Sequence, residues 1–458
     1  MRGGFGRGSK RGSDMRHGSR DGETSLATGN GRRRALLATL AVSLVLGSCA
    51  SADVMSVGSI TPYAPTEQRV TPEAPRTPAR FSRGEGAPSP SFRAFVSALW
   101  PEAQARGVSR SVYDAAFSGV TQDEKIIALT KKQAEFVKPV WEYLASAVSQ
   151  NRLERGTPMT RQWASTLDTI ERTYGVDRKV VMGVWGMETN FGGFTGSHYV
   201  VRALATLAEA KYRGDYFRNE LLTALVILQQ GHVSPDRMEG SWAGAMGQTQ
   251  FMPSSFMRYA VDFTGDGRRD IWTSVPDALA STANYLKQHG WQPGLPWGFE
   301  VKVPSGFRYG RDKKSFAAWA SEGVRRVDGR PLSGAGEARL FLPAGARGPV
   351  FLVTANFDVI KRYNNSDAYA LGVAHLGDRL YGGAPIQTPW PTDQAPLAKH
   401  EREEVQRHLA SRGYDIGDVD GRIGSQTRDA IFAFQESRGL IADGHADNRL
   451  LAQLRQTR

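Results

Sequence analysis

The chain has 458 residues, of which 40% are hydrophobic and 23% charged, and its formal net charge is +12. This length allows roughly two or three domains, and the composition is that of a soluble globular protein, which excludes a fibrous or wholly disordered chain. Half of the net positive charge lies within the first 34 residues. The mild excess that remains is compatible with an anionic polymer as partner. No basic patch is interleaved with aromatic residues, so the pattern argues against nucleic acid.

The N-terminal segment has the features of a secretory signal. Three arginines at 32–34 precede the apolar run 35–46, which is too short to span a bilayer comfortably and ends in Leu-Gly-Ser-Cys49. This ending resembles a bacterial lipobox, which implies cleavage after residues 1–48 and lipid on Cys49. With Ala50 next, it also implies the inner leaflet of the outer membrane, facing the periplasm of a Gram-negative bacterium. The alternative is an ordinary signal or anchor in which the cysteine is incidental.

Composition and periodicity divide the rest of the chain. Residues 49–90 are rich in Pro, Ala, Ser and Thr and are predicted to be a disordered tether. Helical periodicity dominates 91–390, except for a β-rich insertion at 297–355, and a Pro-rich linker leads to a three-helix unit at 397–458. Helices are expected at 135–150, 158–174, 178–188, 199–210, 216–231, 277–289, 357–363 and 368–381.

One acid lies in an apolar stretch. Residues 180–196 read VVMGVWGMETNFGGFTG, and Glu188 is the single carboxylate among them. Burial in apolar surroundings disfavours the charged form and raises the pKa of a carboxyl group. A carboxyl that is still protonated near neutral pH suits a general acid, so we expect Glu188 to be catalytic. The alternative is a glutamate at a helix end that points to solvent.

Two further stretches carry groups suited to binding a sugar. Ser241 and Gln250 flank a glycine-rich segment, and Tyr363, Asn364 and Tyr369 lie close together later in the chain. Aromatic rings stack on sugar faces, and amides and hydroxyls bond to sugar hydroxyls and N-acetyl groups. The alternatives are a structural glycine-rich turn and a tyrosine that belongs to the core.

Three motifs in this order resemble the lytic murein transglycosylases of the membrane-bound type B family: GMETNFG, GAMGQTQFMPSSFMRYAVDFTGDG and RYNNSDAYALGV, within 91–384. The resemblance implies a mainly α chain with a lysozyme-like catalytic domain, a small β-rich insertion and a small C-terminal three-helix domain. It makes Glu188 the sole catalytic acid and base. The substrate-binding residues that we assign are Asn190, Ser241, Gln248, Gln250, Tyr363, Asn364 and Tyr369.

The implied reaction is cleavage of the bond between N-acetylmuramic acid and N-acetylglucosamine in peptidoglycan. Glu188 first protonates the glycosidic oxygen, and the 2-acetamido group assists, so no second carboxylate is needed. Glu188 then takes the proton of the C6 hydroxyl, which closes a 1,6-anhydro ring. Two alternatives remain: a muramidase of the same fold in which water attacks, and a non-catalytic wall-binding or scaffold lipoprotein.

Another segment resembles the start of an EF-hand loop, and the resemblance to the family implies a calcium site there. The predicted ligands are Asp262, Thr264, Asp266, the Arg268 carbonyl and Asp270, but position twelve is a threonine and not the usual bidentate glutamate. The alternative is an Asp-Gly turn that binds nothing. The expected chemistry itself requires no cofactor, and structural calcium is the one ion suggested.

The C-terminal segment 397–454 resembles the type 1 peptidoglycan-binding module. It carries a DGRIGSQT turn and an FQ pair that is followed by GL and DG. The resemblance implies targeting to the glycan strands of the wall, without catalysis of its own. The alternative is a generic three-helix dimerisation module, and the sequence does not indicate an oligomeric state.

Overall fold

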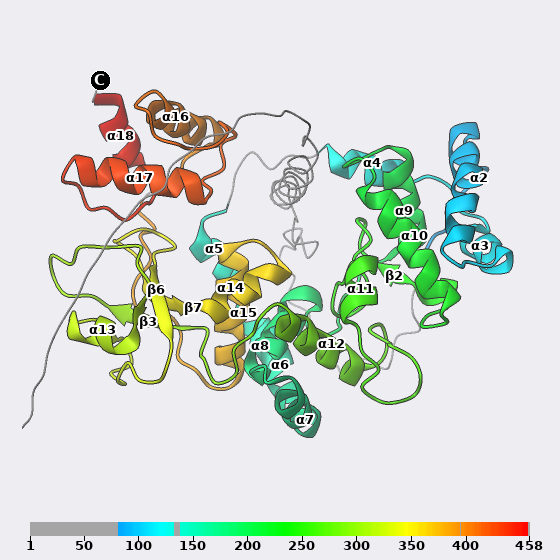
Figure 1. Ribbon diagram of the computed structural model, residues 1–458, viewed down its shortest axis with the longest axis horizontal. Helices are drawn as coiled ribbons and strands as arrows, with labels where there is room; N and C mark the ends of the chain where they lie inside the picture. Colours follow the sequence, from blue (N-terminus) through cyan, green and yellow to red (C-terminus); the bar gives the residue numbers. More distant parts are fainter. Residues whose placement is uncertain (1–80, 132–137, 394, 457–458) are drawn as a thin grey trace, which may run out of the picture. The chain divides into compact units, whose positions relative to one another are not determined.

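The computed structural model describes residues 81–131, 138–393 and 395–456 (Figure 1). The predicted signal segment 1–48, Cys49 and the predicted tether as far as residue 80 lie outside the described residues. In the described part the chain is mostly helical with one small sheet region, which confirms the mainly α prediction. None of the helices described is both long enough and apolar enough to cross a bilayer.

The last residues of the predicted tether are ordered. The ring of Phe81 stacks on Tyr199, with 4.8 Å between the ring centroids. Arg83 pairs with Asp236 at 2.9 Å and donates to two backbone carbonyls of the helical domain. The prediction that the disordered tether continues to residue 90 is therefore wrong for residues 81–90, because an aromatic ring and an arginine fasten this segment to the domain.

Most helices of the catalytic domain agree with the periodicity of the sequence. The predicted single helix at 158–174 is in fact two helices, since the backbone leaves helical geometry at Trp163. The helix predicted at 135–150 corresponds to a shorter helix, which begins at Val140 and ends at Ala147. Residues 135–137 lie outside the described part of the chain. The helices up to the sheet are α2 (Pro90–Ala105), α3 (Arg110–Phe117), α4 (Glu124–Thr130), α5 (Val140–Ala147), α6 (Gln150–Gln162), α7 (Ala164–Tyr174), α8 (Arg178–Thr189), α9 (Val200–Glu209), α10 (Tyr216–Gln229), α11 (Pro253–Tyr259) and α12 (Val275–Gln288), with a short 3-10 turn at Pro235–Arg237.

Two helices cross in close contact at the centre of this domain (Figure 1). They are α8 and α15 (Asp367–Leu380), and α14 (Ala355–Tyr363) leads into the second of them. A Cβ atom on Gly183 of α8 would lie 2.2 Å from the carbonyl oxygen of Val373, and one on Gly377 of α15 would lie 2.3 Å from that of Lys179. Glycine at these positions is therefore required by the close approach of the two backbones.

The β-rich insertion is confirmed as a five-stranded antiparallel sheet of order β4-β6-β7-β3-β5. Val301, Leu352 and Trp319 are among the residues that form its own apolar core. The short helix α13 (Phe316–Ser321), which supplies Trp319, was not predicted. The strands are β3 (Gly298–Lys302), β4 (Lys314–Ser315), β5 (Arg325–Arg326), β6 (Glu337–Phe341) and β7 (Val350–Thr354), and a separate pair joins β1 (His198–Tyr199) to β2 (Glu239–Gly240).

The C-terminal unit consists, as predicted, of three helices: α16 (Lys399–Ala410), α17 (Ser425–Ser437) and α18 (Asn448–Gln456). Two buried glutamines each clamp one Asp-Gly turn. The side-chain oxygen of Gln406 accepts from the amides of Asp420 and Gly421, and that of Gln435 accepts from the amides of Asp443 and Gly444. These repeated contacts explain the paired glutamine and Asp-Gly positions in the sequence.

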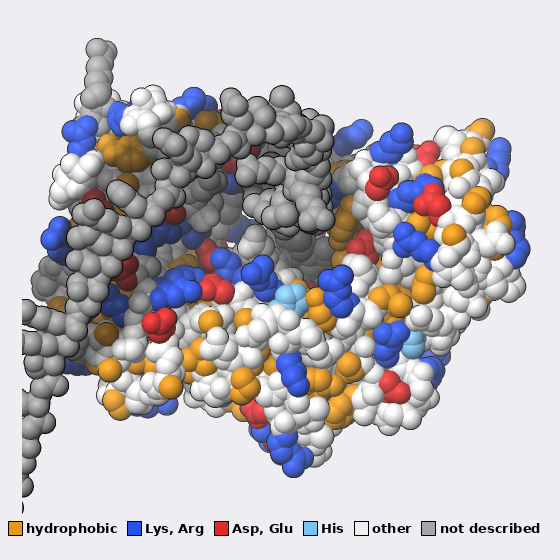
Figure 2. All heavy atoms as spheres, viewed as in Figure 1, with side chains coloured by type: hydrophobic (Ala, Val, Ile, Leu, Met, Phe, Trp, Pro, Cys, Tyr) orange, Lys and Arg blue, Asp and Glu red, His pale blue; other side chains and the backbone are white. Residues whose placement is uncertain are grey.

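Charged side chains are dispersed over the surface. Figure 2 shows basic side chains interspersed with acidic, apolar and polar ones on the face in view. Many arginines of the described part pair with acids, as in the contacts Arg178–Glu171, Arg326–Asp328 and Arg455–Glu404. Many of the basic side chains are therefore engaged in local ion pairs.

Candidate active site

The candidate acid lies in the last turn of α8. The carboxylate of Asp177 accepts from the Lys179 amide at 2.8 Å and caps the start of the helix. The run from Val180 to Gly186 is buried, which explains why an almost wholly apolar sequence forms a helix here. Asn190 ends the helix in a left-handed conformation, with φ of 49°. Glu188 is therefore held on a rigid element, one turn from an abrupt chain reversal.

A tyrosine from a distant part of the chain holds Glu188. The side chain of Ser366 caps α15 by accepting from the Tyr369 amide, which places Tyr369 in the first turn of that helix. Its hydroxyl donates to Oε1 of Glu188 at 2.5 Å. Burial raises the pKa of Glu188 to about 7, against the lowering effect of this hydrogen bond. The structure thus brings together two residues that lie 181 positions apart.

Three further tyrosines surround this carboxyl group. The negative charge of Glu188 acts on Tyr143, Tyr285 and Tyr363 and, together with burial as the larger cause, raises the pKa of each phenol. Tyr363 donates to the backbone oxygen of Thr249 at 2.8 Å, and its ring centroid lies 4.7 Å from that of Tyr285. Sequence reasoning missed Tyr143 and Tyr285, since each lies within an ordinary amphipathic helix and no local pattern marks it.

The glycine-rich turn is fastened to α8 through Gln248. Its side-chain oxygen accepts from the indole nitrogen of Trp185 at 2.9 Å, and its amide nitrogen donates to the Trp272 carbonyl at 3.2 Å. Its backbone oxygen accepts from the Thr189 hydroxyl at 3.1 Å. The structure therefore gives Gln248 a supporting role next to the acid, and its predicted contact with substrate stays a prediction.

Ser241 and Gln250 hold the two ends of the same turn. The Ser241 hydroxyl accepts from the Ala245 amide at 3.0 Å. The amide nitrogen of Gln250 donates to the carbonyl oxygens of Thr195 and Gly247 at 3.0 and 2.9 Å. Gln250 has φ of 50°, a conformation that costs energy for a residue with a side chain. This turn is therefore held against the loop that leaves α8.

The two asparagines of the predicted site lie at helix ends. Asn364 follows α14 and is buried. The side-chain oxygen of Asn190 is buried and has no hydrogen-bond partner among the described residues. A buried carbonyl oxygen without a donor is costly, so it is suited to accept a hydrogen bond from a ligand.

The predicted calcium ligands form a separate loop. The carboxylate of Asp262 accepts from the amides of Gly265, Asp266 and Gly267. Asp266 in turn accepts from the amide and guanidinium groups of Arg268. Among the residues that the structure describes, no group of three or more His, Cys, Asp or Glu side chains is placed to hold a metal ion.

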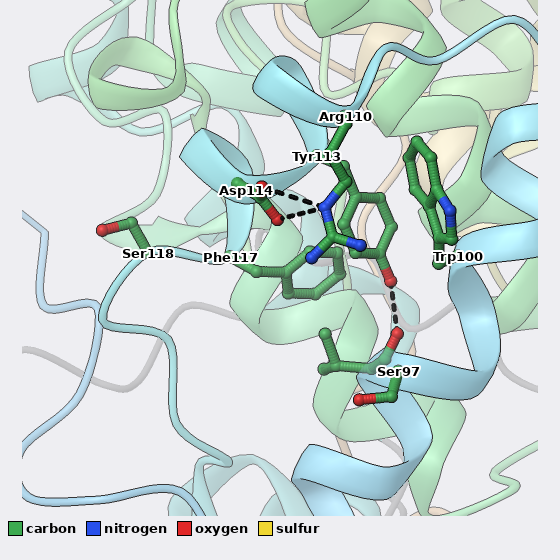
Figure 3. Close-up of a pocket in the computed structure, with 8 residues that line it drawn as sticks. Ser97, Trp100, Arg110, Tyr113, Asp114, Phe117 and Ser118 are labelled. Atoms are coloured by element: carbon green, nitrogen blue, oxygen red, sulfur yellow. Dashed lines mark hydrogen bonds and ion pairs between the residues drawn. The ribbon is translucent and has the colours of Figure 1, made fainter.

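A hollow lies between α2 and α3 (Figure 3). It has a volume of about 260 Å³ and is lined by residues that include Trp100 and Tyr113. Its charged groups are paired with each other, since Arg110 donates to both oxygens of Asp114 at 2.9 Å. None of the motif residues lies in its wall, so it is distinct from the site around Glu188.

Comparison with known proteins identifies the family. The model of the transglycosylase SLT domain matches residues 91–378, and that of the putative peptidoglycan-binding domain matches residues 399–454. The chain belongs to the SLT transglycosylase family. It is thus a peptidoglycan lytic transglycosylase with a lysozyme-like SLT domain and a C-terminal helical binding domain, as the sequence motifs predicted.

Relatives of this SLT transglycosylase include membrane-bound lytic murein transglycosylase B of Escherichia coli K12, 32% identical over 65% of this chain and 84% of the relative. SltB3 from Pseudomonas aeruginosa, solved with NAG-anhNAM-pentapeptide, is 47% identical with a TM-score of 0.76, covering 80% of this chain and all of that one. Slt35 from Escherichia coli, solved in complex with calcium, is 31% identical with a TM-score of 0.54, covering 64% and 93% of the two chains.

In this SLT transglycosylase the site can supply one proton near neutral pH. Burial raises the pKa of Glu188 to about 7, and the Tyr369 hydroxyl acts in the opposite direction. A carboxyl group whose pKa lies near the working pH suits general acid catalysis.

Proposed function

We propose that Glu188 acts first as general acid and then as general base in cleaving the MurNAc–GlcNAc bond of peptidoglycan. The protonated carboxyl gives its proton to the glycosidic oxygen, and the bond from C1 to that oxygen breaks. The carbonyl oxygen of the 2-acetamido group bonds to C1 in its place. The departing GlcNAc keeps the transferred proton on its 4-hydroxyl group.

The second half of the reaction returns the proton to Glu188. The ionised carboxylate removes the proton from the C6 hydroxyl of the muramyl residue. The C6 oxygen then attacks C1, the bond to the acetamido oxygen breaks, and a 1,6-anhydro ring results. Water is not consumed, and Glu188 is ready for another cycle.

The observation that carries this proposal is the state of Glu188. Burial raises its pKa to about 7, so both its acid and its base form are accessible near neutral pH. The hydroxyl of Tyr369 fixes the orientation of the carboxyl at 2.5 Å.

The proposal extends to the location of the enzyme. Lipid on Cys49 would anchor the chain to the inner leaflet of the outer membrane, and the C-terminal unit would hold it on the glycan strands in the periplasm. Support comes from the lipobox-like sequence, from the match to a peptidoglycan-binding domain, and from a relative named as membrane-bound. Such an enzyme serves turnover and remodelling of the wall.

Analysis of the products tests the chemistry. Purified sacculi are digested with the full chain or with Glu188→Gln, and the soluble fragments are identified by mass spectrometry. We expect 1,6-anhydromuramyl ends from the wild type and a loss of about three orders of magnitude in rate for the variant, since a general acid contributes roughly 10²–10⁴-fold. Binding of the variant to sacculi should be unchanged.

Two other results would lead to other functions. Reducing muramyl ends would show that water is the acceptor and that the enzyme is a muramidase. Equal lytic activity in wild type and Glu188→Gln would remove Glu188 from the mechanism altogether.

Calcium has no part in the proposed reaction. Slt35 was solved in complex with calcium, and the loop around Asp262 resembles a calcium loop in sequence. A calcium ion takes six to eight oxygen ligands. In this chain the carboxylates of Asp262 and Asp266 accept hydrogen bonds from groups of the same loop, and their further lone pairs would hold a structural calcium ion together with the other predicted ligands.

A further inference from the structure

A partly buried arginine lies at the corner between α5 and α6. Arg152 is in the first turn of α6, where its backbone amide donates to the side chain of Ser149, which caps the helix. Its Nη1 donates to the carbonyl oxygens of Ser146, at 3.1 Å, and Ala147. These carbonyls belong to the last turn of α5, where a helix has no internal partners for them. One guanidinium group therefore fastens the end of one helix to the start of the next.

The charge of Arg152 is compensated by a helix end. Its side-chain contacts are the two carbonyls and the sulfur of Met187, and no ion pair joins it to an acid of the described chain. Burial lowers its pKa, and its Nε atom is buried without a hydrogen-bond partner among the described residues. A cation at the C-terminus of a helix is stabilised by the partial negative charge of the last carbonyl groups. The guanidinium group is thus committed to holding α5.

The third contact of Arg152 reaches the catalytic helix. Its Nη1 lies 3.9 Å from the sulfur of Met187, which directly precedes Glu188 on α8. Gly372 of α15 closes the same cluster, since a Cβ atom there would lie 3.3 Å from Cε of Met187 and 3.4 Å from Cε1 of Tyr143. The helices α5, α6, α8 and α15 therefore meet next to the acid, and Arg152 joins three of them.

Tyr143 is the residue of α5 that is close to the acid. The negative charge of Glu188 and burial, which is the larger cause, raise the pKa of its phenol. Tyr143 lies one turn before the carbonyls that Arg152 holds, on a helix of eight residues whose start has no side-chain cap. So short a helix has little stability of its own and depends on contacts with its neighbours. A shift at the end of α5 would therefore move Tyr143 relative to Glu188.

We propose that Arg152 is a positioning residue that fixes the end of α5 against α8 and so holds Tyr143 beside the catalytic carboxyl. This inference rests on the proposed role of Glu188, and it extends the site to a residue that does not touch substrate. Arginine suits this task because its planar fork reaches several acceptors at once, whereas lysine is a point charge on a flexible stem.

The test is Arg152→Met in the full chain, alone and together with Tyr143→Ala. Methionine keeps most of the length of the arginine stem but donates no hydrogen bond. We expect kcat/KM on soluble glycan strands to fall about tenfold for Arg152→Met, because a small misplacement of a group at the site lowers the rate. Each rate is measured well below the melting temperature of the variant.

The double variant gives a readout that a loss of stability alone would not change. If Arg152 acts through Tyr143, the two effects on kcat/KM are not additive, and Arg152→Met should cost about twofold or less once Tyr143 is replaced by alanine. Arg152→Lys should be intermediate, because an ammonium group can still donate to one of the carbonyls. Arg161→Met is the matched control, since Arg161 is exposed in the last turn of the same helix, and it should keep the wild-type kcat/KM.

Two results would overturn the proposal. One is a folded Arg152→Met with the wild-type kcat/KM. The other is a loss that persists in full when Tyr143 is replaced by alanine, since Arg152 would then affect the site by another route. If Arg152→Met does not fold, Arg152→Lys is measured in the same way, because it keeps the stem and the positive charge at the end of α5. A wild-type rate for Arg152→Lys, or an effect independent of Tyr143→Ala, would overturn the proposal equally.

Failure of this inference can be told apart from failure of the proposed function. An active Glu188→Gln would remove the acid itself, whatever Arg152 does. An inactive Glu188→Gln combined with a fully active Arg152→Met would keep the mechanism and remove only the positioning role.

Discussion

Glu188 and Asp277 are both acids held inside the catalytic domain, but they differ in what surrounds them. Asp277 accepts from three backbone amides, which replace the water it loses. Glu188 has one donor, the Tyr369 hydroxyl, and burial raises its pKa to about 7. The difference shows that one acid is held by several backbone donors as part of a loop, whereas the other has a single donor in surroundings that favour its protonated form.

The largest expected effect is on the free energy of unfolding, which the buried carboxyl of Glu188 lowers as it ionises. In the unfolded chain this carboxyl ionises near its ordinary value of 4.5, whereas in the folded chain it holds its proton up to about 7. Stability is therefore lost as pH rises through this window. Relative to the wild type, Glu188→Gln should gain roughly 3 kcal/mol in the free energy of unfolding between about pH 4 and pH 8.

Urea unfolding of both proteins at the two pH values measures this gain. Glu142→Gln is the control, since Glu142 is an exposed glutamate in the first turn of α5. A gain of the same size in the control, or none in Glu188→Gln, would contradict the raised pKa of Glu188.

The next effect concerns the single donor of Glu188. Tyr369→Phe removes a hydrogen bond that lowers the pKa of Glu188, so that pKa should rise further. We expect the basic limb of the kcat profile to move to higher pH. The rate should fall about tenfold, because the carboxyl also loses its fixed orientation.

The matched control for this change is Tyr363→Phe. Its hydroxyl donates to the backbone oxygen of Thr249 and not to Glu188. The pH profile of this variant should keep its basic limb in place. A shift in both variants would mean that loss of any nearby phenol, and not of the donor, alters the acid.

The smallest effect is expected at Asp262, which begins the loop between α11 and α12. Asp262→Asn loses one of three amide contacts, as Asp277→Asn does, but at a partly exposed site where water can replace it. We expect a loss of about 1 kcal/mol or less in the free energy of unfolding, with kcat unchanged. If Asp262→Asn and Asp277→Asn lowered the free energy of unfolding by the same amount, the difference in burial between the two aspartates would have no effect on stability.

The main features of the fold and the acid were predictable from local patterns. The apolar run around Glu188, the β-rich insertion and the three C-terminal helices each carry a periodic signal. Local signals failed at Phe81, which stacks on the distant Tyr199, and at Trp163, where the helix expected at 158–174 breaks.

The surroundings of the acid were only partly predictable. Tyr363 and Tyr369 were expected to bind substrate because of a motif, whereas Tyr143 and Tyr285 arrive from helices whose sequence gives no sign of a site. Gln248 was expected to contact substrate, but its donors and acceptor face Trp185 and Trp272. Such pairings depend on how separate segments pack, which no local pattern encodes.

The crossing of α8 and α15 has a consequence for how substrate is handled. Glu188 and Tyr369 belong to these two helices, whose backbones touch at Gly183 and Gly377. Since packed backbones cannot slide past each other without a clash, the proton donor and the group that orients it behave as one rigid body. The relative position of the acid and its donor is thus set by helix packing and does not depend on a bound glycan strand.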